Sequence, residues 1–229
     1  MDTREGGTRP PFVVLEGIEG AGKSTQAALL SEWFAERGVD HLLAREPGGT
    51  PVGEAIRGVV LNRVDLDPPP ESELFLILAA RAAYVRDVVR PTLEAGRLML
   101  SDRYAMSTLA YQGYGRELDL DAIVAANALA TGGLEPDVVL MLDVPVEEGL
   151  GRREMAAGSL DRIESAGVSF LGRVAEGYRQ LSAKHPDVER IDATRGPKEV
   201  QEALREALQR RFPEVFGAPT PVDQESPPR

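Results

Sequence analysis

The sequence predicts an α/β fold, a five-stranded parallel sheet with helices on both faces. Three observations predict it. Short apolar segments rich in β-branched residues alternate with helix-like patterns, which is the order typical of parallel sheets. The 229 residues suffice for one well-buried domain, and the hydrophobic and charged fractions, 42% and 28%, are ordinary for a globular protein. The expected strands span residues 12–16, 39–44, 98–102, 138–143 and 188–192.

The segments between these strands carry helix signals. Gly38 ends the first expected helix, and Trp33 lies on the apolar face of that helix, so we expect this tryptophan in the core. Three prolines followed by Glu71 start a long apolar-periodic helix, and Gly132 and Gly133 end another. Four of the expected helices span residues 23–37, 71–89, 119–131 and 198–212.

Composition divides the chain into one domain and two tails. We expect residues 1–10 to be a disordered N-terminal tail, residues 11–212 to form the domain, and the proline-rich residues 213–229 to be a disordered C-terminal tail. Residues 149–166 are polar, carry arginines and are punctuated by glycine. We therefore expect them to form a mobile lid that begins as a helix.

Net charge and cysteine content narrow the function classes. With 26 basic and 37 acidic residues, the net charge is -11, so we expect no binding to nucleic acid or to an anionic membrane surface. The chain has no cysteine and no apolar segment of membrane-spanning length, so we expect a cytoplasmic protein. All but three of the basic residues are arginines, whose planar side chains suit bidentate phosphate contacts.

GIEGAGKST, residues 17–25, follows the first strand and opens the first helix. Its glycines, lysine and serine match a phosphate-binding P-loop in the context that this motif requires. The glycines let backbone N–H groups surround a phosphate, Lys23 reaches the β and γ phosphates, and Ser24 can bind Mg²⁺. The alternative is a glycine-rich turn without a ligand, which needs neither the lysine nor the hydroxyl. The expected ATP-binding residues are Gly17, Ile18, Glu19, Gly20, Ala21, Gly22, Lys23, Ser24 and Thr25.

A P-loop leaves three classes of protein open: a GTPase, an ATPase motor or transporter, and a small-molecule kinase. The Asn-Lys-x-Asp pattern of GTPases is absent, and no expected strand ends in the Asp-Glu pair of an ATPase. These absences favour a P-loop NTPase fold with kinase activity. A nucleotide-binding regulator without phosphotransfer also stays open.

Two further polar loops leave the second and third strands: REPGGT at residues 45–50 and SDRY at residues 101–104. Ligands bind at the carboxyl ends of parallel strands. We therefore expect Arg45, Glu46, Asp102 and Arg103 to meet the P-loop in one crevice. The alternative for Asp102 and Arg103 is an ion pair on the surface.

Five segments, in order, resemble the thymidylate kinase family: GIEGAGKSTQ, REPGGTPVGEAIR, ESELFLILAAR, DRYAMSTLAYQGYGR and LDRIE. The resemblance covers about residues 12–212. It implies transfer of the γ-phosphoryl group of ATP to dTMP, which gives dTDP, a step in dTTP synthesis. It also implies Mg²⁺ as the cofactor, ATP and dTMP as small-molecule partners, adenine contacts near residues 194–197, and a homodimer formed through the helix around residues 71–89.

By this resemblance, one set of side chains holds the dTMP phosphate, a second contacts the thymine and a third surrounds the deoxyribose. The phosphate set is Arg103 and Arg57, framed by Glu46; the base set is Arg81, Thr108, Gln112 and Ile77; the sugar set is Tyr111, which would clash with a 2′-hydroxyl, and Glu19, which would face the 3′-OH.

Ile77 departs from the family. Many relatives have an aromatic residue that stacks on the base at this position, four residues before the thymine-reading arginine. Phe75 lies two positions earlier, on a different side of the expected helix. A kinase for another nucleotide or nucleoside, such as dUMP or thymidine, therefore stays open.

The charges of the reactants indicate a mechanism. The second pKa of the acceptor phosphate is about 6, so the acceptor is mostly a dianion at neutral pH and needs no general base. Cations must instead offset the repulsion between two anions and the charge that develops between them. The expected catalytic residues are Lys23, Arg103, Arg153 and Asp102, with Ser24 as the protein ligand of Mg²⁺.

The assignment of a lid arginine follows from the resemblance. Family members carry a closing arginine either in the P-loop or in the lid, and the P-loop here has Gly20 and Ala21 instead. The candidates in the lid are Arg152, Arg153 and Arg162, of which we favour Arg153; the alternative is a solvated basic helix face. Asp102 would orient Arg103 or a water bound to Mg²⁺.

Overall fold

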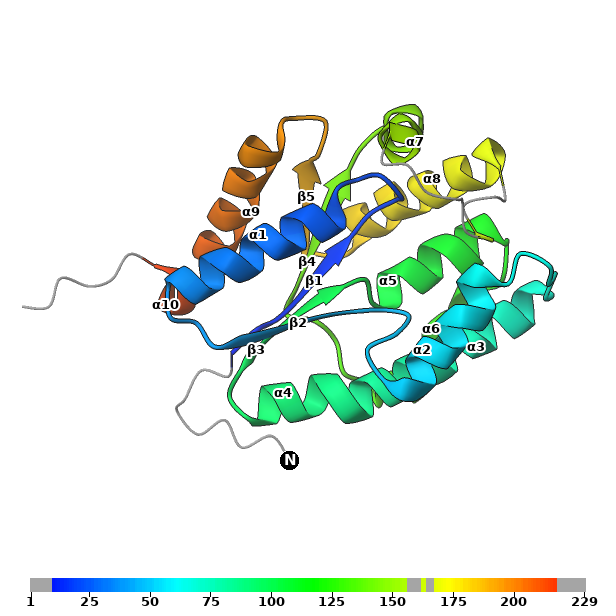
Figure 1. Cartoon of the computed structure of the whole chain (residues 1–229), viewed down its shortest axis with the longest axis horizontal. Coiled ribbons are helices and arrows are strands. Elements are labelled where there is room, and N and C mark those ends of the chain that lie inside the picture. The colour runs from blue at the N-terminus through cyan, green and yellow to red at the C-terminus, as the bar shows by residue number, and fades with distance from the viewer. Residues whose placement is uncertain (1–9, 156–161, 164–166, 218–229) are drawn as a thin grey trace, which may run out of the picture.

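The fold is a single parallel sheet, as the sequence predicts. The structure, a computed structural model, describes residues 10–155, 162–163 and 167–217 (Figure 1). The strand order is β2-β3-β1-β4-β5, and every neighbouring pair is parallel. The strands are β1 (Phe12–Glu16), β2 (His41–Arg45), β3 (Leu98–Asp102), β4 (Val138–Asp143) and β5 (Val188–Asp192).

Strand boundaries match the expectation except at β2. This strand begins two residues late because the N–H of Val39 still bonds the carbonyl of Phe34, 2.9 Å away, in the turn that ends the first helix. The central strand β1 is buried along its whole length. It delivers its last residue, Glu16, to the carboxyl edge of the sheet, directly before the P-loop.

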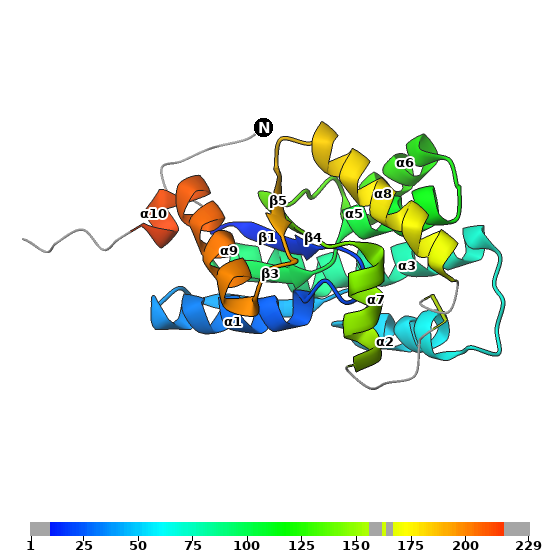
Figure 2. The ribbon, with the colours of Figure 1, turned by 90° about the horizontal axis from the view of Figure 1, so that it is seen from above.

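Helices cover both faces of the sheet, which confirms the predicted α/β layers. α1 (Lys23–Glu36) packs against β1 to β3, and α9 (Pro197–Arg211) lies beside it and contacts β5. On the opposite face, α4 (Arg90–Glu94) contacts β3, and α8 (Val168–Lys184) contacts β4 and β5. Figure 2 shows the sheet between α1 and α8. Gly38, with a φ of 70°, follows α1 as expected.

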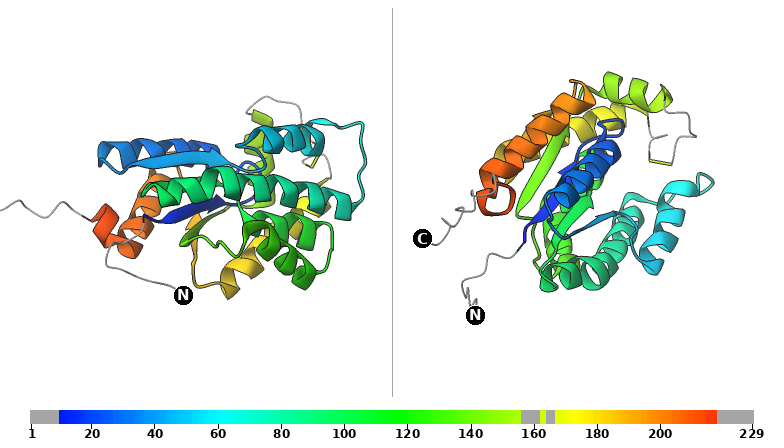
Figure 3. Two further views of the ribbon diagram at one scale, coloured as in Figure 1. Left: turned by 90° about the horizontal axis from the view of Figure 1, so that it is seen from below. Right: turned by 60° about the vertical axis from the view of Figure 1, so that its left-hand side comes forward.

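The long helix expected over residues 71–89 is longer in the structure. α3 (Pro70–Tyr84), the π-helical segment η2 (Val85–Val89) and α4 follow one another without a break, and Figure 3 shows them as one rod. The wider π-helical turn lies just before Pro91, whose ring and missing N–H disfavour a regular α-helix. The predicted end at residue 89 is therefore too early, because the sequence pattern does not reveal this local adjustment.

Several short helices follow the strands and surround the carboxyl edge. After β2 come α2 (Pro51–Arg57) and η1 (Gly58–Asn62); after β3 come α5 (Ala105–Thr108) and η3 (Leu109–Gly115). α6 (Leu120–Thr131) packs on α3, begins at the capping side chain of Asp119 and ends at Gly132 and Gly133, as predicted. α7 (Val146–Met155) follows β4 and covers the first part of the expected lid.

The C-terminal prediction is wrong for residues 213–217. Pro213–Phe216 forms a short helix, α10, and the Phe216 side chain is fully buried. Its ring stacks on Trp33 and on Phe34, each at 5.2 Å between centroids, and Arg37 donates to its carbonyl. Trp33 is in the core, as predicted. The proline-rich composition of this segment indicated disorder. Composition does not reveal that the ring of Phe216 packs on Trp33 and Phe34, which are far away in the sequence.

Three other expectations fall on residues outside the described part of the chain. These are the tails at residues 1–9 and 218–229 and the lid residues 156–161 and 164–166. Among the described residues, no helix combines the length and the apolar character needed to cross a bilayer.

We expect Phe216→Ala to lower the free energy of unfolding by about 3–5 kcal/mol, because it removes a fully buried ring and leaves a cavity. Urea unfolding would measure the change. The control, Leu129→Ala, truncates a side chain that is 87% exposed and should change stability by less than about 0.5 kcal/mol. Equal stabilities for the two variants would mean that α10 does not dock as described.

Candidate active site

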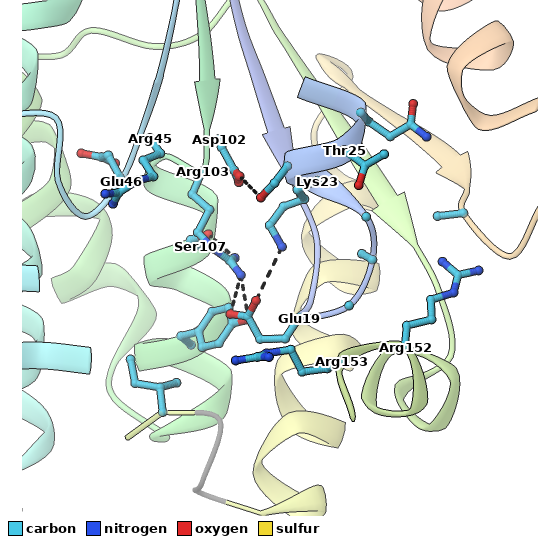
Figure 4. Close-up of a pocket in the computed structure, with 18 of the residues that line it drawn as sticks. Glu19, Lys23, Thr25, Arg45, Glu46, Asp102, Arg103, Ser107, Arg152 and Arg153 are labelled. Atoms are coloured by element: carbon cyan, nitrogen blue, oxygen red, sulfur yellow. Dashed lines mark hydrogen bonds and ion pairs between the residues drawn. The ribbon is translucent and has the colours of Figure 1, made fainter. Parts of the chain in front are cut away.

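The carboxyl edge of the sheet holds a cavity of about 860 Å³. Segments far apart in the sequence line it: the P-loop, the loops after β2 and β3, α3, η3, α7 and the loop before α9. The predicted convergence of Arg45, Glu46, Asp102 and Arg103 with the P-loop is observed, since all four line this cavity (Figure 4). Arg103 is not on the open surface, because only 14% of its side chain is exposed.

The P-loop takes a conformation that its glycines permit. Gly20 and Gly22 have φ angles of 72° and 93°, which other residues rarely adopt. Lys23 is buried and curls back over the loop, where its ammonium donates to the carbonyls of Gly17 and Ile18 at 3.0 and 2.9 Å. The loop is therefore a compact cradle. Residues Glu19 to Thr25 line the cavity, and the other two predicted ATP-binding residues, Gly17 and Ile18, form the support behind it.

α7 packs directly on the P-loop through two glycines. A Cβ on Gly20 would lie 1.9 Å from the carbonyl oxygen of Gly149, and a Cβ on Gly149 would lie 2.6 Å from the carbonyl oxygen of Glu19. No side chain fits between them. The close approach brings the arginines of α7 to the cavity.

Arg103 is the most densely contacted cation of the site. Its φ of 76° is unusual for a residue with a side chain and turns it back toward the P-loop. The guanidinium donates to Glu19 Oε1 at 2.7 Å, to Ser107 Oγ at 3.0 Å, to Tyr178 Oη at 3.1 Å and to the carbonyl of Gly17 at 3.1 Å. The position of this arginine is set by at least three elements of the fold.

Glu16 anchors this arrangement, although it does not contact Arg103. It is fully buried, and its Oε2 accepts from Ser107 Oγ at 2.6 Å and from Tyr178 Oη at 2.8 Å. Its Oε1 accepts from the N–H groups of Tyr104 and Ser107. The carboxylate thus fixes the two hydroxyls that hold Arg103.

Glu19 neutralises the two cations beside it. Its carboxylate lies 2.7 Å from Arg103 and 3.9 Å from the ammonium of Lys23. Burial alone would raise the pKa of Glu19, but Arg103 and then Lys23 outweigh burial and hold this pKa at about 2. Burial, followed by the charge of Arg103, lowers the pKa of Lys23. The two cations repel each other, and the negative charge of Glu19 offsets this repulsion.

Ser24 and Asp102 form an oxygen-rich corner at the end of β3. Ser24 Oγ donates to Asp102 Oδ2 at 3.2 Å. Asp102 Oδ1 is buried and has no hydrogen-bond partner in the described part of the chain. Carboxylate and hydroxyl oxygens that leave room for water and phosphate ligands suit Mg²⁺. No larger group of carboxylates, histidines or cysteines that could hold a metal occurs among the described residues.

A buried ion pair lies on the other side of Arg103. Arg81 Nε donates to Glu46 Oε2 at 2.9 Å, and both side chains are at most 3% exposed. Arg81 also donates to Thr108 Oγ1, to Asn127 Oδ1 and to the carbonyl of Tyr104. Burial raises the pKa of Glu46 although Arg81 opposes it. Asn127 was not predicted; it holds the planar fork of Arg81 from α6.

The remaining predicted dTMP-binding residues also line the cavity. Arg57 donates to the carbonyl of Pro47 at 3.0 Å, next to a cis peptide bond between Glu46 and Pro47. The hydroxyl of Tyr111 lies 3.3 Å from Arg103 Nη2. Ile77, the departure from the family, faces the cavity from α3 and is partly buried.

The three candidate lid arginines have different surroundings. Arg152 pairs with Glu148 at 2.6 Å and points away from Glu19 in Figure 4. Arg162 does not line the cavity; its guanidinium donates to Glu73 and to the carbonyl of Val60. Arg153 lines the cavity and, in Figure 4, extends toward the space below Glu19.

Several residues that build the site were missed by the sequence analysis: Glu16, Ser107, Tyr178, Asn127 and Glu73. Each is buried or partly buried and makes its key contacts with residues distant in the sequence. One signal was available, since Glu16 is a charged residue at the end of an otherwise apolar strand. If such a residue is buried, its charge requires hydrogen-bond partners.

A P-loop beside two converging groups of arginines defines a class of protein: a P-loop kinase whose cavity accepts a triphosphate and a second phosphorylated molecule. Comparison with known proteins narrows the class. The family model for thymidylate kinase matches residues 15–204.

Individual relatives agree. A thymidylate kinase of Desulfovibrio desulfuricans is 46% identical over 205 residues, which covers 86% of this chain and 94% of the relative. The thymidylate kinases of Synechococcus sp. (strain WH7803) and Prochlorococcus marinus (strain MIT 9313) are both 47% identical, over 204 and 208 residues, with 86% and 88% of this chain and 94% of each relative covered. The chain belongs to the thymidylate kinase family.

The stabilising role of Glu19 should depend on pH. Because its folded-state pKa lies near 2, below the ordinary value of 4.5, its charge stabilises the fold above about pH 4.5, and this stabilisation is lost as the pH falls toward 2. Glu19→Gln should therefore lower the free energy of unfolding at pH 7 and by less at pH 3.5. Urea titrations at both pH values would show this. A constant difference between variant and wild type would contradict the assignment.

Proposed function

We propose specific residue roles for the reaction of this family. As a member, the protein transfers the γ-phosphoryl group of ATP to dTMP and gives dTDP. One observation carries the assignment of roles: Lys23 of the P-loop and Arg103 of the β3 loop reach the same carboxylate of Glu19, at 3.9 and 2.7 Å. A donor phosphate on the P-loop and an acceptor phosphate on Arg103 would meet there.

The donor side is the P-loop. Its backbone N–H groups and Lys23 would surround the β and γ phosphates, and the N-terminus of α1 adds partial positive charge. The adenine would lie near residues 194–197, which line the same cavity. Gln26 supports this end, because its Nε2 donates to the carbonyl of Pro197 at 2.9 Å and ties α1 to that loop.

The acceptor side is the region around Arg103 and Arg81. Arg103, with Arg57, would hold the dTMP phosphate, and Glu46 would frame the site. Arg81 would meet the thymine edge, with its plane fixed by Glu46. The other expected contacts are Thr108 and Gln112 to the base, Ile77 over it, Tyr111 beneath the deoxyribose and Glu19 toward the 3′-OH, all lining the cavity.

Catalysis in this arrangement is electrostatic. The dianionic acceptor needs no base, and fixed cations lower the barrier because they are already oriented before charge develops. We assign this work to Lys23, Arg103 and Arg153. Arg153 is favoured over Arg152 and Arg162 because it extends toward Glu19 in the cavity, whereas Arg152 points away from Glu19 (Figure 4) and Arg162 does not line the cavity.

Ser24 and Asp102 would hold Mg²⁺, the first directly and the second by orienting its water ligands. When bound, this ion supplies charge neutralisation on the β and γ phosphates. The assignment is supported by the position of the two side chains, which line the cavity next to each other, with Ser24 Oγ 3.2 Å from Asp102 Oδ2.

A homodimer through α3 is a further proposal. Phe75 is 66% exposed on this helix, and Ala79 and Ala82 are exposed along the same side. An apolar stripe of this kind favours contact with a second copy. Light scattering that gave a single-chain mass at micromolar concentration would contradict it.

A cytoplasmic location stays a prediction from the sequence.

The activity is tested with a panel of acceptors: dTMP, dUMP, UMP, CMP and thymidine. We expect dTMP to have the highest kcat/KM. Faster phosphorylation of UMP or CMP would contradict the dTMP site, and ATP binding without any dTDP would indicate a regulator.

Arg103→Ala should lower kcat/KM for dTMP by about 100-fold or more while the Kd for ATP stays within about twofold. Arg210→Ala, which removes an exposed arginine on α9, is the control.

The metal assignment is tested with Asp102→Asn. The variant loses one negative charge beside Ser24, so the Mg²⁺ concentration for half-maximal turnover should rise roughly 10–100-fold, and excess Mg²⁺ should restore part of kcat. Asp121→Asn, on the exposed side of α6, should leave the Mg²⁺ requirement unchanged. An unaltered requirement in Asp102→Asn would remove Asp102 from the metal site.

A further inference from the structure

A buried carboxylate outside the cavity contacts three donors at once. Glu73, on α3, is 1% exposed. Its Oε1 accepts from Gln112 Nε2 at 2.9 Å and from Arg116 Nε at 3.2 Å; its Oε2 accepts from Arg116 Nη2 at 3.1 Å and from Arg162 Nη2. None of the roles described above uses this residue.

The charge state of Glu73 decides how Gln112 is oriented. Burial alone would raise the pKa of Glu73, but hydrogen bonds from Arg116, Gln112 and Arg162 outweigh burial and lower it, so the group is a carboxylate at neutral pH. A carboxylate only accepts hydrogen bonds. Gln112 must therefore turn its NH₂ group toward Glu73, and its amide oxygen points away from Glu73.

Gln112 connects this cluster to the acceptor site. It is 1% exposed and nevertheless lines the cavity, one helical turn after Thr108. With the NH₂ group held by Glu73, the atom that it offers to the cavity is a hydrogen-bond acceptor. Thymine carries a hydrogen on N3, whereas cytosine has a lone pair there. An acceptor at this place favours the first base and repels the second.

We propose that Glu73 is a positioning residue that sets base specificity: it fixes the amide of Gln112 so that its oxygen faces the base and selects a nucleotide with an N3–H. This inference rests on the proposed dTMP site. It does not require Glu73 to touch the nucleotide.

The same carboxylate also fixes a residue from the expected lid. Arg162 donates to Glu73 and to the carbonyl of Val60 at 2.9 Å, and its own N–H bonds the carbonyl of Leu61 at 3.0 Å. Its neighbour Ile163 is 7% exposed and lines the cavity. Base recognition and the placement of this part of the chain therefore depend on one side chain.

Glu73→Gln tests the proposal. The new amide can donate as well as accept, so Gln112 is free to turn its NH₂ group toward the base. We expect the KM for dTMP to rise about tenfold, the Ki of dCMP against dTMP to fall, and the preference for dTMP over dCMP to narrow at least tenfold, with the KM for ATP unchanged. A folded variant that keeps the wild-type preference overturns the proposal.

Glu73→Asp is the matched variant. It perturbs packing at the same position but keeps a group that only accepts hydrogen bonds, so we expect dCMP to stay excluded whatever the change in the KM for dTMP. If Glu73→Asp loses the preference as fully as Glu73→Gln does, amide orientation is not the cause and the proposal is wrong. Glu71→Gln, two residues earlier on the exposed side of α3, should behave as wild type.

A double-mutant cycle covers the case in which Glu73→Gln does not fold. If Glu73 acts through Gln112, then Glu73→Ala, which removes the acceptor, should add little to the loss of preference for dTMP over dCMP once Gln112 is already alanine. Fully additive effects would overturn the proposal. If the wild-type enzyme does not phosphorylate dTMP, the proposed function itself is wrong. If the wild-type enzyme is specific for dTMP and Glu73→Gln keeps the same preference for dTMP over dCMP, this inference alone is wrong.

Discussion

The site depends on keeping Lys23 and Arg103 close together in a partly buried place. Two like charges at short range repel, and each loses hydration on burial. Glu19 resolves this, because its carboxylate contacts both cations and stays ionised in the folded protein. The same cations are then available to two phosphates. Without a fixed anion between them, the chain would have to hold two unpaired charges at the end of its central strand.

Buried glutamates orient the hydrogen-bonding side chains around the cavity. Glu16 fixes hydroxyls behind Arg103, Glu46 fixes the plane of Arg81, and Glu73 holds Gln112. Each carboxylate is at most 5% exposed. A buried charge is stable only with partners, so each glutamate constrains the groups around it more strongly than an apolar residue would. The orientation of the cavity walls is therefore built into the folded protein.

The topology explains why these groups meet. β1 and β3 are neighbours in the sheet, so the P-loop and the Arg103 loop leave the same edge side by side. The helices α3 and η3, on the opposite side of the cavity, bring the residues of the proposed dTMP site toward these two loops. The close contact of Gly20 with Gly149 adds α7 and its arginines.

The sequence alone determined the α/β class, four of the five strands to the residue and the P-loop, because periodicity and glycine-rich turns are local properties of the chain. The dTMP-binding residues that the family resemblance implied all line the cavity, whereas Ser107, which also lines it, was missed. The sequence did not reveal Glu16 and Glu73 as organising residues, or the docking of Phe216. Their importance comes from partners far away in the sequence, such as Tyr178, 162 positions from Glu16, and Arg37, 179 positions from Phe216. Only the folded chain decides which buried charge meets which donor, since that pairing follows from long-range packing and not from neighbours in sequence.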